Sequence, residues 1–167
     1  EGPRVLLNGK PIFFNAVNIH EEMPLRKARA YSHDDAEVLL GWAKELGCNM
    51  VRLAHYPHNE HMIRLAEKMG LMVWSELPVY QHIGFSAPEV EAKMDLMLRE
   101  MIGRDRNRCA VVVWNLSNET YHFTPNRTEA LIELTETCRQ LDSTRLITHV
   151  INTQGYRNHT FHVWDTL

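Results

Sequence analysis

The stretch VVVWNLSNET (residues 111–120) decides the fold, because an unbroken apolar run passes directly into polar residues. A strand of a parallel sheet is covered on both faces, so it is apolar throughout rather than alternating. The carboxyl end of such a strand is where polar side chains can reach a ligand without crossing the core. We therefore predict a buried parallel strand here, with Asn118 and Glu119 at its functional end.

Strands and helices are predicted to alternate outward from this stretch along the whole chain. The strands are expected at 12–18, 50–54, 71–75, 110–116 and 145–150, and the helices at 32–47, at 59–70, from Ser86 onward and at 129–141. Ser32 and Asp35 match a capping box, and Gly47 and Gly70 are typical of helix ends. This order indicates parallel strands joined by right-handed crossovers.

Each predicted helix has apolar residues three and four positions apart, which is the pattern of one buried face. The residues expected to face inward are Ala36, Leu39, Leu40, Ala43 and Leu46, then Val90, Met94, Met97 and Met101, then Leu131, Leu134, Cys138 and Leu141. In SAPE (86–89), Ser86 is expected to cap the third helix. Cys48, Cys109 and Cys138 fit no metal-ligand spacing, and we expect packed free thiols.

Two α/β architectures fit this order, a doubly wound open sheet and a (β/α)₈ barrel. The doubly wound sheet would place a glycine-rich phosphate turn after its first strand, and NAVNIHEEM (15–23) contains no glycine. A complete barrel takes about 250 residues. We therefore predict a partial (β/α)₈ TIM barrel of about five parallel strands with intervening helices.

Polar side chains lie within or just after the carboxyl end of every predicted strand. They are Asn18, His20 and Glu21, then Arg52, His55 and Tyr56, then Glu76, Tyr80 and His82, then Asn118 and Glu119, and last His149 and Asn152. Each alone has a structural explanation: Glu119 as a carboxylate at a helix N-terminus, Arg52 and Glu76 as an ion pair. Together they indicate one cleft at the rim where barrel enzymes keep their sites.

Composition narrows the classes of partner. The chain has 167 residues, 44% of them hydrophobic and 23% charged, and its formal net charge is −3 without a basic patch. We therefore expect no nucleic-acid partner. No apolar run approaches the length that spans a bilayer, so no membrane partner is expected. The chain has neither an initiator Met nor a signal-peptide pattern, which suggests a piece of a longer protein and leaves its location open.

The residue types at the rim suit a hydroxyl-rich ligand such as a sugar. Asn and His side chains bond hydroxyl groups, while Trp74, Trp114 and Trp164 offer aromatic faces to sugar C–H surfaces. Hydrolysis of a glycosidic bond uses two carboxyl groups, one of which acts as general acid.

Three stretches carry a resemblance to a known family. They are LNGKPIFFNAVNIHEEMP (7–24), ELGCNMVRLAHYPHNEHMIRLAEKMGLMVWSE (45–76) and RDRNRCAVVVWNLSNE (104–119). In order and spacing they resemble the catalytic barrel of glycoside hydrolase family 2, which contains β-galactosidases, β-glucuronidases and β-mannosidases.

This resemblance implies a role for each matching residue. It implies that Glu119 is the general acid/base and that Asn118 bonds the sugar 2-hydroxyl. It further implies that His20 and His55 contact substrate. Arg52 matches the floor of the site, and Glu76 matches the acidic residue that closes the third strand.

The sequence also departs from the family pattern. Ile19 replaces a usual basic residue, which puts the subsite contacts there in doubt. His82 falls where some members have a magnesium ligand, but Tyr80 stands where the partner glutamate would be. We therefore expect no metal site and no cofactor.

Residues 1–167 are accordingly interpreted as the N-terminal part of such a barrel, with strands 1 to 5 and without the nucleophile strand. The first expectation for the parent is a retaining exo-β-glycosidase of β-galactosidase type. β-Glucuronidase or β-mannosidase specificity, an endo-acting barrel hydrolase and a non-catalytic carbohydrate-binding or structural module stay open. We expect the isolated chain to be inactive, and to self-associate or to contact the rest of the parent chain.

Overall fold

The computed structural model describes residues 4–121 and 125–151, whose main feature is a five-stranded parallel sheet. Its strands are β3 (Ala16–Ile19), β6 (Met50–Leu53), β7 (Met72–Glu76), β8 (Val111–Asn118) and β9 (Leu146–Val150). They lie side by side in chain order, each parallel to the next. A doubly wound sheet would reverse its strand order part-way. The sheet is therefore an arc of a (β/α)₈ barrel, as predicted.

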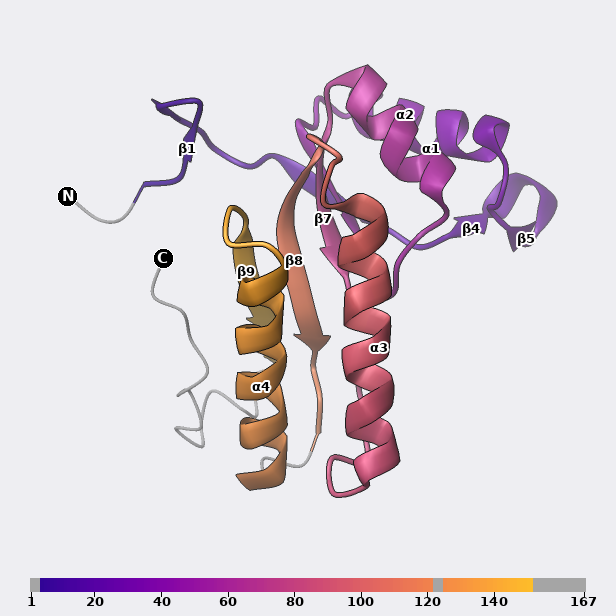
Figure 1. The fold of residues 1–167 in the computed structure, drawn as a ribbon. Coiled ribbons are helices and arrows are strands. Elements are labelled where there is room, and N and C mark those ends of the chain that lie inside the picture. Colours follow the sequence, from indigo (N-terminus) through magenta and orange to yellow (C-terminus); the bar gives the residue numbers. More distant parts are fainter. Residues whose placement is uncertain (1–3, 122–124, 152–167) are drawn as a thin grey trace.

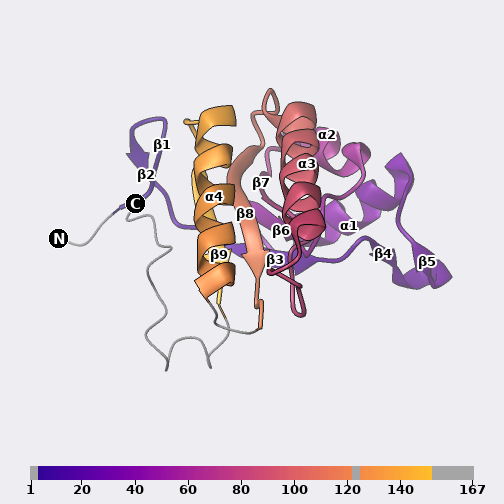
Figure 2. The same ribbon diagram turned by 60° about the horizontal axis from the view of Figure 1, so that its bottom comes forward.

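Four helices connect these strands, and they are α1 (His33–Glu45), α2 (Glu60–Met69), α3 (Pro88–Asp105) and α4 (Pro125–Leu141). Figures 1 and 2 show α3 and α4 side by side against the sheet, with α1 and α2 packed together next to them. The main core lies between these helices and the sheet. Its centre includes the fully buried side chains of Leu40, Leu98, Leu116 and Leu131.

The predicted helix signals are present with small shifts. Ser32 and Asp35 form the expected capping box at α1. Burial raises the pKa of the Asp35 carboxyl, but hydrogen bonds from Tyr31, Arg26 and Ser32 outweigh burial and lower the pKa to about 2. Gly70 ends α2 in a left-handed conformation, with φ at 67°.

Three local predictions are wrong. Leu46 was expected to face inward, but α1 ends at Glu45 and the Leu46 side chain is 68% exposed. Ser86 does not cap α3, because that helix begins at Pro88 after an Ala87 cap that has no side-chain bond. Cys109 is exposed rather than packed, whereas Cys48 and Cys138 are buried free thiols.

Two short antiparallel pairs were not predicted. β1 (Leu6–Leu7) and β2 (Lys10–Pro11) flank Asn8 and Gly9, whose φ angles are 51° and 77°. Positive φ at both central residues is the reason two-residue hairpin turns favour Asn-Gly, so this signal was available in the sequence. β4 (Glu22–Met23) and β5 (Ala28–Arg29) enclose the short helix η1 (Pro24–Arg26).

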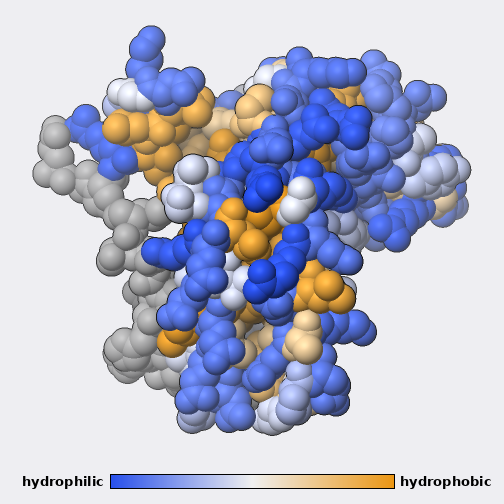
Figure 3. Space-filling model, viewed as in Figure 1, coloured by the Kyte–Doolittle hydropathy of each residue, from blue (hydrophilic) through white to orange (hydrophobic). Residues whose placement is uncertain are grey.

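The surface is polar over most of the helical face, with hydrophobic residues in separate groups over α3 and α4 and near β1 (Figure 3). Among the described residues, no helix is both long and apolar enough to cross a bilayer.

Candidate active site

The carboxyl ends of β6, β7 and β8 bring Arg52, Glu76 and Asn118 into contact. The Arg52 guanidinium donates through Nε to Glu76 Oε1 and through Nη2 to Asn118 Oδ1, the latter at 2.6 Å. Glu76 is fully buried, and the Arg52 side chain is 18% exposed. The guanidinium also lies 5.5 Å from the centre of the Trp74 ring. Arg52 therefore joins all three strands at one rim of the sheet.

Histidines line the same rim. His55 Nδ1 lies 2.8 Å from Glu76 Oε2, so Glu76 holds both His55 and Arg52. The His20 ring, at the end of β3, stands edge-on to the His55 ring with centroids 5.2 Å apart. His20 is exposed and His55 is partly exposed, which leaves both imidazoles open to a ligand.

Glu119 immediately follows β8 and leaves the strand in a left-handed conformation, with φ at 48°. Such a backbone is uncommon for a residue other than glycine, and it is retained where the surroundings hold it. The Glu119 N–H donates to Val150 O of β9 at 2.8 Å. This turn directs an exposed carboxyl group out of the strand beside the buried Asn118.

The loop after β7 completes this part of the rim. Asn118 N–H donates to Val79 O at 2.8 Å, and Gln81 N–H donates to Asn118 O at 3.2 Å. Tyr80 lies between these contacts and its ring is 5.9 Å from the His55 ring. The sequence interpretation counted Tyr80 among the polar residues that follow the third strand, and the structure places it at this rim beside His55.

The structure thus places His20, Arg52, His55, Glu76, Asn118 and Glu119 at the carboxyl ends of adjacent parallel strands. Other strand-end residues lie elsewhere. Glu21 is buried and accepts hydrogen bonds from Arg29 and from the Asn59 N–H, which ties the first loop to α2. His149 is buried against Ser117 and Thr135, so it does not face the rim.

The predicted aromatic platforms divide into three cases. Trp114 was expected to face a sugar, but it is fully buried and its Nε1–H donates to Asp142 Oδ2 at 2.9 Å. That prediction is wrong. Trp74 remains at the rim through its contact with Arg52. Trp164 and Asn152 lie outside the described residues.

A hollow of about 670 Å³ opens beside the rim, and sequence reasoning missed it. Its walls include Tyr56, whose ring lies 6.1 Å from His20, together with Lys27 and Arg29 from the β4–β5 hairpin. β4 and β5 have two residues each, which is too short for the apolar pattern by which strands were predicted, so sequence reasoning did not find this hairpin.

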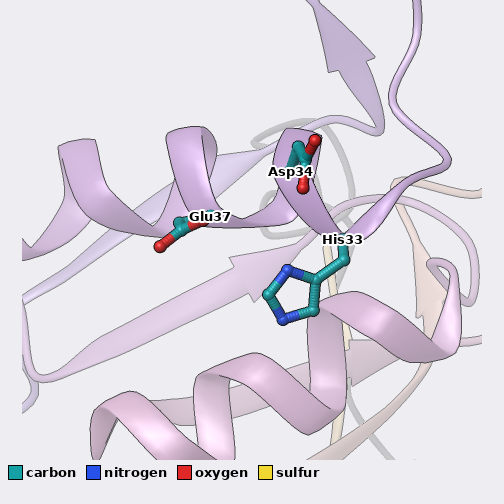
Figure 4. Close-up of side chains that lie close together, drawn as sticks. All are labelled: His33, Asp34 and Glu37. Atoms are coloured by element: carbon teal, nitrogen blue, oxygen red, sulfur yellow. The ribbon is translucent and has the colours of Figure 1, made fainter.

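One group of possible metal ligands occurs in the described part of the chain, and none of its members is among the rim residues described above. His33, Asp34 and Glu37 have ligand atoms within 4.8 Å of one another on the first turns of α1, all exposed (Figure 4). Carboxylates are stabilised near a helix N-terminus by the helix dipole. That effect accounts for the acidic residues without an ion.

Comparison with known proteins identifies the family. The model of the glycosyl hydrolases family 2 TIM barrel domain matches residues 1–165. The chain belongs to glycoside hydrolase family 2. Among curated family 2 relatives, the β-glucuronidase of Rattus norvegicus is 30% identical over 156 residues, which cover 90% of this chain and 24% of that protein. The β-galactosidase of Thermoanaerobacterium thermosulfurigenes is 33% identical over 150 residues, covering 86% and 20%.

Solved structures agree with this family 2 assignment. The β-D-glucuronidase of Dictyoglomus thermophilum superposes with a TM-score of 0.85 at 28% identity, covering 93% of this chain and 29% of that one. A β-galacturonidase from Eisenbergiella tayi, solved with galacturonate bound, gives 0.82 at 27% identity, covering 89% and 27%. The chain therefore spans about a quarter of the length of the relatives it matches.

Proposed function

We propose that the full-length protein is a retaining exo-β-glycosidase in which Glu119 is the general acid/base. The observation that carries this proposal is the exposed Glu119 carboxyl at the end of β8, beside an Asn118 that Arg52 fixes. In the first step Glu119 protonates the glycosidic oxygen as the bond to the leaving group breaks. In the second step its carboxylate takes a proton from the water that attacks the sugar.

Arg52 determines what Asn118 offers to the sugar. Because the guanidinium donates to Asn118 Oδ1, the amide oxygen is occupied and Nδ2 carries the two remaining donors. An N–H donor at this position suits a sugar hydroxyl next to the reacting carbon. A hydrogen bond that strengthens in the transition state contributes directly to the rate.

Glu76 has the corresponding effect on His55. Its buried carboxylate next to Nδ1 favours the tautomer that carries the proton on Nδ1. His55 Nε2 is then an acceptor for a second sugar hydroxyl. Asn118 would therefore donate a hydrogen bond to the sugar and His55 would accept one. Glu76 would not contact the sugar but would orient the His55 ring.

A retaining mechanism needs a second carboxylate about 5–5.5 Å from the first. Among the described residues, Glu21 and Glu76 are the other carboxylates that follow or end a strand. Both are buried, and each forms an ion pair with an arginine. We infer that the nucleophile comes from outside residues 1–167. A polypeptide of these residues alone should therefore have no glycosidase turnover.

The same isolated polypeptide is expected to associate. β3 and β9 are the edge strands of the sheet, and each has one neighbouring strand in the described part of the chain. Open edges of this kind favour pairing with another chain. Sedimentation should show a species larger than a monomer, and a monodisperse monomer would contradict this expectation.

For the sugar, β-glucuronides are the first candidates, because most of the relatives compared are β-glucuronidases. β-Galactosides are the second, supported by the relative that is 33% identical over 150 residues. Hydrolysis rates for matched p-nitrophenyl β-glucuronide, β-galactoside and β-mannoside would rank these specificities. We expect the β-glucuronide to be hydrolysed fastest, the β-galactoside next and the β-mannoside most slowly.

The test of the acid/base assignment compares Glu119→Gln with Glu129→Gln, an exposed glutamate on α4, in the full-length protein. Loss of general acid catalysis should lower kcat/KM, which reports the first step, roughly 10²–10⁴-fold for poor leaving groups and far less for activated aryl glycosides. Glu129→Gln should resemble the native protein on both. Equal small losses on both substrates would refute the role of Glu119, and full-length protein without turnover would favour a non-catalytic module.

A further inference from the structure

Helix α4 packs against β8 (Figure 1), and its Thr135 side chain connects to the end of that strand through His149. Ser117 is fully buried, and its Oγ lies 2.9 Å from Nδ1 of His149 on β9. The opposite ring nitrogen, Nε2, lies 3.0 Å from Oγ1 of Thr135 on α4. The His149 ring therefore bridges β8 and α4.

The direction of each hydrogen bond in this bridge follows from Thr135. The Thr135 hydroxyl donates its proton to Leu131 O at 2.8 Å, so its oxygen must accept from His149 Nε2–H. In a neutral ring Nδ1 is then an acceptor, and Ser117 donates to it. Burial, and after it the Arg127 charge, lower the pKa of His149 to about 4, which keeps the ring neutral.

A second bridge from α4 reaches the other side of Glu119. Arg127 is 2% exposed and donates through Nε to Thr120 Oγ1 at 2.8 Å. Arg127 and Thr135 are eight residues apart, about two helical turns, so both lie on the face of α4 that meets the sheet. Ser117 and Thr120 thus flank Glu119, and each is bonded to a group that α4 holds.

Glu119 itself is fixed between these bridges by its backbone. Its N–H donates to Val150 O, and Val150 directly follows His149. The left-handed φ of 48° persists only while the surrounding structure holds it. Without the His149 bridge, both the end of β8 and the carbonyl that accepts from Glu119 would lose an anchor.

We propose that Ser117, Thr120, Arg127, Thr135 and His149 form a positioning device, the α4 clamp, which sets the direction of the Glu119 carboxyl. This inference rests on the proposed role of Glu119. The clamp residues touch no substrate and act through the backbone on either side of the acid/base. A misplacement of about 1 Å at a reacting group is enough to lower a rate about 10²-fold.

The test uses the full-length protein with Thr135→Val, which removes the hydroxyl at nearly constant shape, and Ser117→Ala. Thr137→Val on α4 is the control for the first variant, because Thr137 is similarly exposed. Ser75→Ala is the control for the second, because Ser75 is equally buried on the adjacent β7 and its Oγ has no hydrogen-bond partner. Thr135→Ser keeps the hydroxyl and serves as the rescue variant.

If the clamp positions Glu119, both clamp variants should lower kcat/KM, which reports the acid-assisted first step, at least about tenfold for poor leaving groups and less for activated aryl glycosides. Thr135→Ser should recover most of the lost rate, and both controls should stay near the native rate. A purely structural role would lower the rates on the two substrate types equally, or would lower only the melting temperature, and either result would overturn the proposal.

Glu119→Gln, measured in parallel, separates the two ways of failing. If Glu119→Gln shows the leaving-group dependence and the clamp variants match their controls, the clamp is refuted and the proposed function stands. If Glu119→Gln shows no such dependence, the proposed function itself fails. Should Ser117→Ala not fold, the comparison among Thr135→Val, Thr135→Ser and Thr137→Val decides the outcome.

Discussion

Opposite ends of the five-stranded parallel sheet each contain an arginine–carboxylate pair, and the two pairs differ in what surrounds them. At the amino end, Arg145 pairs with Asp142 and also donates to Val111 O and Arg108 O, at 2.7 and 2.9 Å. At the carboxyl end, Arg52 pairs with Glu76 and donates to the side chain of Asn118.

Asp142 is bonded on both carboxylate oxygens by groups of the fold. Its Oδ2 accepts from the buried Trp114 Nε1–H, and its Oδ1 accepts from the N–H and hydroxyl of Thr144. Around the Arg52–Glu76 pair, by contrast, exposed groups remain: His55, which contacts Glu76, is partly exposed, and Asn118, which accepts from Arg52, is followed by the exposed Glu119. At the amino end of the sheet, therefore, the polar groups bond to one another, whereas at the carboxyl end some polar groups remain available to a ligand. Barrel enzymes keep their sites at the carboxyl end.

The largest expected effect comes from the carboxyl end. Asn118→Ala in the full-length protein should lower kcat roughly 10²–10³-fold, because a donor aimed at the transition state is lost. Asn107→Ala, at an exposed position just before β8 at the opposite end of the sheet, is the matched control and should leave kcat unchanged. Steady-state kinetics would measure both. Similar rates for the two variants would remove the functional distinction between the ends.

A stability effect is expected at the amino end. Asp142→Asn should lower the free energy of unfolding by about 3 kcal/mol without changing kcat, because it leaves Arg145 without its counter-charge. Glu133→Gln, at an exposed position in the middle of α4, is the control. Burial raises the pKa of Asp142, but hydrogen bonds from Thr144, Trp114 and Arg145 outweigh burial and hold it well below its usual value.

This lowered pKa also fixes a pH dependence. The stabilisation by Asp142 should be complete above the unfolded-state pKa of about 3.9 and be lost as pH falls further. Chemical denaturation at pH 7 and pH 3 would measure both effects. A change of kcat with unchanged stability would contradict the structural role of Asp142.

A smaller pH effect tests where His149 lies. Because its folded-state pKa is lowered to about 4, the folded protein binds fewer protons than the unfolded chain below pH 6.5. Its contribution to stability is present above pH 6.5 and is lost towards pH 4, by about 2 kcal/mol between pH 7 and pH 5. The difference in unfolding free energy between the native protein and His149→Gln would isolate this contribution. If the difference between the two proteins did not change with pH, His149 would behave as a solvent-exposed histidine, and its buried position would be contradicted.

The alternation of strands and helices made the barrel arc predictable, because the local spacing of apolar residues indicates each strand and each helix. The errors arose where tertiary structure decides. Leu46 fits the helical spacing of α1, but the helix ends one residue earlier, so the side chain points to solvent. The β4–β5 hairpin was missed for another reason, because its strands have two residues each and are too short to show an apolar pattern.

The candidate site was predictable because strand-end positions place polar residues at one rim. The α4 clamp was not. His149 follows the same strand-end pattern as Arg52, yet it is buried against α4. The pairing of β8 with β9 shifts register between Asn115 and Ser117, and a shift of this kind changes which residues face each side. Simple alternation cannot foresee that change, which is why Ser117 and Thr135 were missed.

The central claim is that the exposed carboxyl of Glu119 is the acid/base of a retaining enzyme. It is tested most directly by azide rescue of Glu119→Ala in the full-length protein. With an activated aryl β-glycoside the first step needs little acid, and azide can then attack the glycosyl–enzyme without base catalysis. The account predicts that azide accelerates this variant and yields a glycosyl azide of retained β configuration, whereas Asn107→Ala shows neither effect. Native-level turnover of Glu119→Ala, or no acceleration by azide, would contradict it.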